Sequence, residues 1–188
     1  MIKIEFAGSP EELSSPFTKE HKILCHTWGE YLKSKNGKLN AKYTAWAIKL
    51  KGSFQDQKQF SIEIEKMTMS SGNLLISSKK NKYEKTKIKI ENFKEEANFR
   101  ISKRTMLSQI RASFSNNFNV LSKDLVVKYN SEFNPSENSL INILVEQSTK
   151  LALSKVEYIM KRELLILEFN HLVSDVNLIE RIIKRDFT

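Results

Sequence analysis

Apolar and polar residues alternate with a period of two in several runs between residues 44 and 102. This alternation restricts the fold of the chain more than any other feature. Four runs show the alternation, and within each run the residues that share one phase are Thr44, Trp46, Ile48 and Leu50; Phe60, Ile62 and Ile64; Thr86, Ile88 and Ile90; and Phe99 and Ile101. A further apolar run lies at residues 74–76, and turn-forming segments separate the runs. The pattern predicts an antiparallel β meander of four to six strands with one apolar and one polar face.

The phase of the alternation changes within the segment that follows Ile64. Met67 and Met69 continue it one residue out of phase with the run that begins at Phe60. Since one inserted residue on one strand produces such a shift, the sequence predicts a bulge or a strand end near Lys66.

The segment before the meander contains strand, helix and turn signals. Residues 2–6 alternate as a first strand, and residues 10–13 have the acidic first turn of a short helix. Residues 23–32 place apolar side chains on one helical face, including Trp28, but Gly29 weakens that pattern and the assignment stays open. Asn36-Gly37 is a turn, and it is a strong hairpin signal if strands flank it.

Helical spacing appears beyond residue 104. The predicted elements are a helix at 107–114, a strand at 125–129, a helix that opens at Ser136 or Asn138 and runs through Leu151, strands at 156–160 and 164–169, and a final helix after Ser174-Asp175. Strands that precede mixed helices and strands are typical of α+β proteins. We therefore predict an α+β fold with an antiparallel β meander in the N-terminal half, helices packed on one side and further short strands in the C-terminal half. We expect a single domain over residues 1–188, with a subdivision near 104 as the alternative.

Length and composition describe an ordinary globular chain. Its 188 residues, of which 40% are hydrophobic and 28% charged, can bury roughly 70% of the unfolded surface. The single Cys25 cannot form an internal disulfide, residues 1–5 lack the features of a signal peptide, and no apolar run approaches the ~18 residues of a membrane-spanning helix. We expect a soluble cytoplasmic protein with no transmembrane segment, and the oligomeric state stays open.

Positive charge is concentrated in the middle of the chain. Residues 33–128 hold 21 lysines and arginines against 8 acidic residues, whereas residues 1–32 and 129–188 each carry a small negative surplus. Such segregation favours a surface that attracts polyanions. The alternative is a solvated surface that reflects genome composition, since Lys, Asn and Ile are all abundant and lysine greatly outnumbers arginine.

This charge pattern leads to three functional hypotheses. The first is a non-enzymatic binding module whose basic sheet surface meets an acidic protein or polyanion. The second is a nucleic-acid-binding protein, for which the tentative polyanion-binding residues are Lys79, Lys80, Lys82, Lys85, Lys87, Lys89, Arg100, Lys103 and Arg104. The third is a metal-dependent hydrolase built on Glu63, Glu65 and Lys66, with Glu20 or Asp56 as a further ligand.

Other candidate sites are weaker. His21, Cys25 and His26 lie close in sequence, but a zinc site needs at least three ligands and a thiol nucleophile needs a neighbour that lowers its pKa. The five glycines are scattered singly, so no phosphate-binding loop is present. We expect no cofactor and no metal, and enzymatic activity is the less favoured interpretation.

Aromatic residues in the basic region raise the question of base stacking. They are Trp46, Tyr43, Phe54, Phe60 and Tyr83. Trp46 and Phe60 share the apolar phase of their strands and are expected to face the helices, whereas Tyr43 and Tyr83 are expected to be freer.

Overall fold

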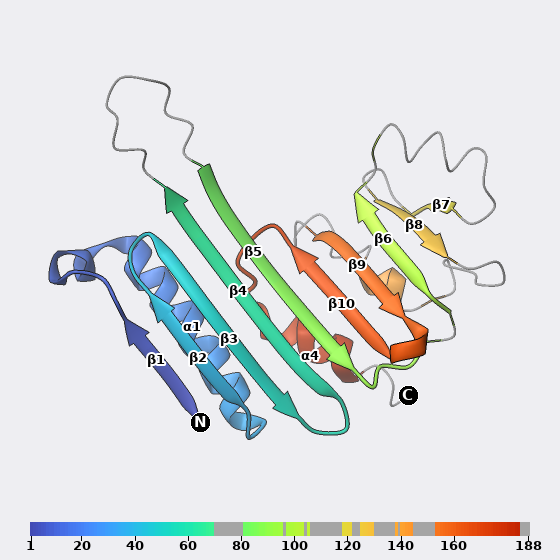
Figure 1. Ribbon diagram of the computed structural model, residues 1–188, viewed down its shortest axis with the longest axis horizontal. Helices are drawn as coiled ribbons and strands as arrows, with labels where there is room; N and C mark the ends of the chain where they lie inside the picture. Colours follow the sequence, from blue (N-terminus) through green and yellow to red (C-terminus); the bar gives the residue numbers. More distant parts are fainter. Residues whose placement is uncertain are drawn as a thin grey trace.

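A ten-stranded sheet is the main element of the fold, with strand order β1-β2-β3-β4-β5-β10-β9-β6-β8-β7 (Figure 1). The computed structural model describes residues 1–69, 81–95, 97–103, 105, 118–121, 125–129, 138, 140–144 and 153–184. The strands are β1 (Ile2–Phe6), β2 (Lys38–Tyr43), β3 (Ala47–Gln55), β4 (Gln59–Met69), β5 (Asn81–Glu91), β6 (Phe99–Lys103), β7 (Phe118–Val120), β8 (Leu125–Tyr129), β9 (Leu153–Ile159) and β10 (Leu164–Phe169). The labelled helices are η1 (Pro10–Ser14), α1 (Pro16–Ser34), η2 (Met160–Arg162) and α4 (Val176–Lys184). The chain is therefore mixed α and β, and mostly sheet.

The predicted runs at 44–50, 60–64 and 86–90 correspond to β3, β4 and β5, which pair in sequence as antiparallel neighbours. Strand β2, which was not predicted, adds a further antiparallel neighbour to β3. The run at 99–101 is β6, but it pairs with β9 and β8 and does not close the meander beside β5. The first strand is confirmed as β1, and it runs parallel to β2. Parallel neighbours need a crossover connection, and α1 supplies it. The C-terminal strands extend the same sheet, since β10 pairs with β5 on one side and with β9 on the other.

Helix α1 resolves the open assignment at residues 23–32. Its buried face carries Leu24, Trp28 and Leu32 against the sheet. Asn36, at a positive φ of 53°, donates its N–H to the Lys33 carbonyl at 3.1 Å, and Gly37 donates to the Leu32 carbonyl at 2.7 Å. This pair of bonds is a Schellman end. Asn36-Gly37 therefore ends a helix and is not a hairpin turn, since a helix precedes it.

The turn between β2 and β3 corrects the expected strand through Trp46. The Thr44 hydroxyl accepts hydrogen bonds from the N–H groups of Trp46 and Ala47, both at 3.0 Å, so the chain turns here instead of extending. Trp46 is consequently 54% exposed, while Tyr43, expected to be freer, is buried in the core. Tyr83 is 50% exposed and Phe60 is buried, as predicted.

Several C-terminal predictions are confirmed. Strand 125–129 is β8, and the strands predicted at 156–160 and 164–169 are β9 and β10. Asn138 caps the helical residues 140–144 by accepting the Ile141 N–H at 3.0 Å, and Asp175 caps α4 by accepting the Leu178 N–H at 3.0 Å. The elements predicted at 74–76 and 107–114 lie outside the described residues.

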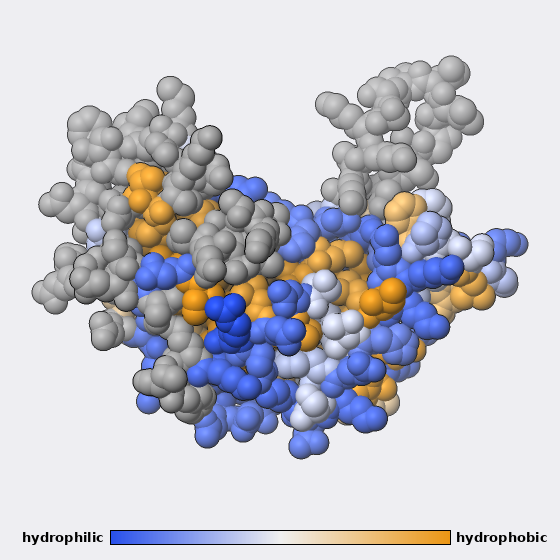
Figure 2. Space-filling model, turned by 180° about the vertical axis from the view of Figure 1, so that it is seen from behind, coloured by the Kyte–Doolittle hydropathy of each residue, from blue (hydrophilic) through white to orange (hydrophobic). Residues whose placement is uncertain are grey.

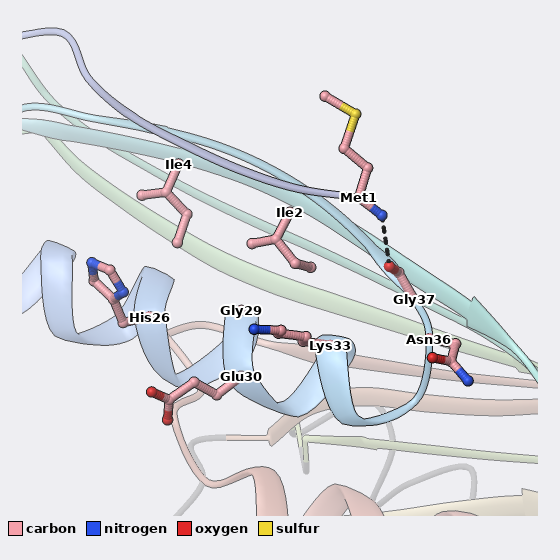
Figure 3. Close-up of a pocket in the computed structure, with 9 residues that line it drawn as sticks. All are labelled: Met1, Ile2, Ile4, His26, Gly29, Glu30, Lys33, Asn36 and Gly37. Carbon is pink, nitrogen blue, oxygen red and sulfur yellow. Dashed lines mark hydrogen bonds between the residues drawn. The ribbon is translucent and has the colours of Figure 1, made fainter.

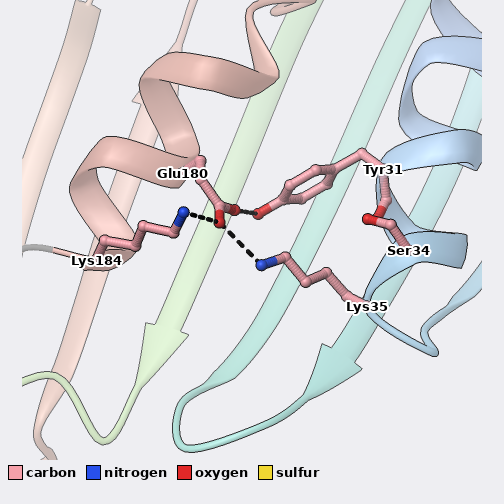
Figure 4. Close-up of polar contacts among 5 residues, drawn as sticks. All are labelled: Tyr31, Ser34, Lys35, Glu180 and Lys184. Atoms are coloured by element: carbon pink, nitrogen blue, oxygen red, sulfur yellow. Dashed lines mark hydrogen bonds and ion pairs between the residues drawn. The ribbon is translucent and has the colours of Figure 1, made fainter.

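Glu180 of α4 connects this helix to α1 (Figure 4). Its carboxylate accepts the Tyr31 hydroxyl at 2.6 Å and pairs with Lys35 at 2.8 Å and with Lys184 at 3.1 Å. Burial alone would raise the pKa of Glu180, but the bonds from Lys35, Tyr31 and Lys184 outweigh it and lower that pKa to about 2. The bond between Tyr31 and Glu180 thus joins α1 and α4 directly. Figure 2, which shows the molecule from behind, has hydrophobic patches between hydrophilic side chains.

Candidate functional site

The outer face of the sheet, turned toward the viewer in Figure 1, is the candidate site. It consists of the side chains that alternate with the core residues Leu50, Ile62 and Ile88. Its cationic residues are Lys3, Lys38, Lys42, Lys49, Lys51, Lys85, Lys87, Lys89, Arg100, Lys128 and Lys155. Its acidic residues are Glu5, Glu63, Glu65, Glu91, Glu157 and Glu168. Cations outnumber carboxylates, so the described part of this face is positive.

The cations form rows across the strands, because side chains at paired positions lie side by side. One row runs from Glu5 through Lys42, Lys49 and Glu65 to Lys85. The neighbouring row contains Lys51, Glu63, Lys87, Glu168 and Lys155. Both rows alternate in sign along most of their length.

Ion pairs neutralise part of this face. Glu63 pairs with Lys51 at 3.1 Å, and this bond, reinforced by Lys89 and Lys87, lowers the pKa of Glu63 despite partial burial. Burial favours a higher pKa for Glu168, but the Lys87 and Lys85 ammonium groups at 3.3 and 3.4 Å lower it. Both carboxylates therefore stay ionised at neutral pH.

Other cations of the outer face form no ion pair among the residues that the structure describes. They are Lys3, Lys38, Lys49, Lys89 and Arg100. Two of them, Lys3 and Lys49, line a depression of 520 Å³ over β1–β4. Lys42, which pairs with Glu5 at 3.3 Å, Lys51 and Glu65 line it too. The depression is therefore a part of the outer face where unpaired ammonium groups and a concave surface coincide.

The predicted polyanion-binding residues are brought together in part. Lys85, Lys87 and Lys89 lie next to one another on the outer face, and Arg100 lies on the same face beyond β10 and β9. Lys103 is exposed at the end of β6, three residues after Arg100. Because successive side chains of a strand point to opposite faces, Lys103 lies on the face opposite to that of Arg100. Lys79, Lys80, Arg104 and the side chain of Lys82 lie outside the described residues.

Sequence reasoning missed the cations of the depression. Lys42, Lys49 and Lys51 lie on adjacent strands, and Lys3 comes from β1. The signal was present in the sequence, because Lys38 and Lys42 share one phase of β2, and Lys49 and Lys51 share one phase of β3. Lys3 could not be added without knowing that β1 pairs with β2.

The residues suggested for a metal-dependent hydrolase do not converge. Glu63 and Glu65 lie among lysines on the outer face, while Lys66 points from β4 toward the core. Glu20 is exposed on α1, and Asp56 lies in the turn after β3. Among the described residues, no three His, Cys, Asp or Glu side chains are grouped closely enough to hold a metal ion.

Lys66 is instead the centre of a buried polar cluster that the sequence did not reveal. Strand β4 pairs with β3 and β5 without a register shift, so the expected bulge is absent and Lys66 continues the buried row of Phe60. Its ammonium donates to His21 Nε2 at 3.0 Å and pairs with Glu84 at 3.6 Å. His21 Nδ1 donates to the Thr44 carbonyl at 2.8 Å, so Nε2 is the free acceptor.

Burial controls the titration of this region. It lowers the pKa of His21, with the Lys66 charge acting in the same direction against the Thr44 bond. Burial also raises the pKa of Cys25 to about 12. The Cys25 thiol is therefore protonated at neutral pH and a poor nucleophile. His26 is exposed and belongs to a different surface of α1.

Comparisons of the chain with protein-family models, with curated proteins and with solved structures found no match. No helix in the described part of the chain is long and apolar enough to cross a membrane.

Proposed function

We propose that the protein is a non-enzymatic binding module that holds an acidic partner, a protein surface or another polyanion, on the outer face of its sheet. The observation that supports this most is the 520 Å³ depression, which is lined by the unpaired ammonium groups of Lys3 on β1 and Lys49 on β3. The proposal takes the helices of the chain to be collected on the opposite face, so that this one stays open. The proposal also takes the protein to be cytoplasmic, a location with which its single free cysteine is compatible.

The chemistry of the outer face suits a flexible acidic chain. Lysine is a hydrated point charge that attracts carboxylates and phosphates without the fixed fork geometry of arginine. Alternating rows of Lys and Glu leave unpaired cations spaced across the sheet, so contacts to several separate anions are favoured over one tightly held ion. We therefore expect modest affinity that depends strongly on salt.

Binding is tested with polyglutamate as the ligand and a triple variant, Lys38→Gln, Lys49→Gln and Lys89→Gln. These side chains form no ion pair among the described residues, so their loss should leave the fold intact. We expect affinity to fall steeply between ~50 and ~200 mM salt, and the triple variant to bind about tenfold more weakly with a shallower salt dependence.

The matched control carries the same three changes at exposed lysines outside the outer face, Lys19, Lys22 and Lys161. Its affinity should stay within about twofold of the unaltered protein. Equal weakening of both variants, or no binding at low salt, would contradict the proposal.

Nucleic-acid binding is the second candidate, and Tyr83 is the observation that favours it. This ring is 50% exposed near the start of β5, two residues from Lys85 on the outer face. A base can stack on such a ring while nearby lysines neutralise the phosphates.

A single-stranded oligonucleotide distinguishes this candidate from the first. We expect Tyr83→Ala to weaken oligonucleotide binding by about 1–3 kcal/mol and to leave polyglutamate binding unchanged, with Tyr83→Phe retaining affinity for both. If Tyr83→Ala binds the oligonucleotide as tightly as the unaltered protein, stacking has no part and the first candidate alone remains.

A further inference from the structure

Strand β1 stands at one end of the sheet order, and its outer edge carries no partner strand among the described residues. Toward β2, the Met1 carbonyl accepts the Leu39 N–H at 3.0 Å, and the Ala7 N–H donates to the Tyr43 carbonyl at 2.8 Å. Peptide groups alternate in direction along a strand. The N–H and C=O groups of Ile2, Ile4 and Phe6 therefore point to the open edge.

A groove of 670 Å³ follows this edge between β1 and α1 (Figure 3). Ile2 and Ile4 point into it from β1, and His26, Glu30 and Lys33 border it from α1. Gly29 forms part of the floor; a Cβ at this position would lie 3.3 Å from Ile4 Cδ1, so the helix sits close to the strand. The edge thus has unpaired backbone groups beside an apolar groove, which is the arrangement that accepts an additional strand.

We propose that a second copy of this chain supplies that strand, through antiparallel β1–β1 pairing about a twofold axis at Ile4. This assembly is isologous, with the same strand contributed by both copies. It joins the two sheets into one and closes the groove of each copy against the other.

Backbone geometry selects the class of register. Residues that exchange both backbone bonds in an antiparallel pair must be those whose peptide groups face the open edge. Only Ile2, Ile4 and Phe6 meet this condition, so the partners in β1–β1 pairing are drawn from these three. A twofold axis at Ile4 pairs Ile4 of one copy with Ile4 of the other, and Ile2 of each copy with Phe6 of the other. This register uses the whole strand.

Charge selects among the remaining registers. The Ile4-centred register places Lys3 of each copy opposite Glu5 of the other, at the non-hydrogen-bonded positions where side chains lie closest. A shift of one step either way places Lys3 opposite Lys3, or Glu5 opposite Glu5. Lys3 and Glu5 are both exposed on the outer face, so nothing buried obstructs these contacts. The strand is therefore complementary to itself in one register and repels itself in its neighbours.

The apolar side chains of β1 also favour a second copy of the chain as the partner. Ile2, Ile4 and Phe6 are only half-buried in one copy, although each packs against the core. Pairing places Ile2 of one copy beside Phe6 of the other on the helix side of the joined sheet. The exposed apolar surface of the groove is removed from water, which favours association.

Charge exchange tests the proposal directly, with oligomeric state measured by sedimentation equilibrium. The unaltered protein is expected to be a dimer. Lys3→Glu puts Glu opposite Glu twice, and Glu5→Lys puts Lys opposite Lys twice, so each single variant should dissociate at least about tenfold more readily. The double variant Lys3→Glu/Glu5→Lys restores both opposite-charge pairs and should recover dimerisation.

Mixing the two single variants gives the most specific result. The Lys3→Glu copy then presents a carboxylate at both positions, and the Glu5→Lys copy presents an ammonium group at both. The mixture should therefore form a heterodimer, whereas neither variant pairs with itself. The control Lys49→Glu alters an exposed lysine on β3, two strands from the edge, which forms no ion pair among the described residues, and it should leave the dimer intact. Circular dichroism checks that each variant is folded.

A monomeric unaltered protein would overturn the proposal, and so would single variants that remain dimers, because another surface would then be responsible. Failure of the double variant or of the mixture to associate would exclude the Ile4-centred register. Since the binding test above alters neither Lys3 nor Glu5, it can fail or succeed independently of this one.

Discussion

Replacing Trp28 by alanine is expected to lower the free energy of unfolding by about 4 kcal/mol. Trp28 is fully buried, and its ring stacks on Phe60 of β4 with centroids 6.2 Å apart. Its Nε1 donates to the Val173 carbonyl at 2.8 Å, in the segment that leads into α4. One side chain thus joins α1, the sheet and the segment before α4, so truncation leaves both a cavity and an unpaired buried carbonyl.

Denaturant unfolding measures this loss, and the second tryptophan is the matched control. Trp46→Ala removes the same atoms from a side chain that is 54% exposed and packs only against Phe17 in the described ring contacts, with centroids 6.2 Å apart. It should cost about 1 kcal/mol or less. Trp28→Phe, which keeps a ring but loses the bond to Val173, should fall between the two. Equal losses for both alanine variants would show that α1 is not anchored as described.

Replacing Lys66 by methionine is expected to destabilise the fold by about 3–5 kcal/mol, although methionine matches lysine in length. The Lys66 side chain is 9% exposed, and that of its partner Glu84 is 17% exposed. Without the ammonium, the Glu84 carboxylate loses its buried cation and His21 Nε2 loses its donor. Removing the cation of this largely buried ion pair, together with the donor to a buried imidazole, costs more than the missing packing.

A double variant separates the charge effect from packing. Glu84→Gln added to Lys66→Met removes the charge left behind, so this double variant should be about 1–3 kcal/mol more stable than Lys66→Met alone. The control is Lys85→Met, one residue along β5 on the outer face, where the ion pair with Glu168 is partly exposed. It should cost about 1 kcal/mol or less. A simple sum of the single losses in the double variant would contradict the proposed coupling.

The sequence alone determined the features that depend on local geometry. Alternation at Ile48 and Leu50, at Phe60 and Ile62, and at Ile88 and Ile90 identified the strands of the meander, because a strand has a side-chain period of two. The caps at Asn138 and Asp175 were also predictable, since a capping oxygen and its N–H lie three residues apart. The lysines of β5 were placed on one polar face for the same reason.

Only the tertiary structure decided the features that depend on what lies next to a residue in space. Asn36-Gly37 suits a hairpin and a helix end equally, because both use a positive φ, and the preceding helix settles which one forms. Lys66 breaks the apolar pattern of β4 and yet points inward, because His21 and Glu84, from distant parts of the chain, satisfy its charge. The depression on the outer face likewise depends on β1 lying parallel to β2. Pairing between strands far apart in sequence is set by burial and by long-range partners, which a local pattern does not encode.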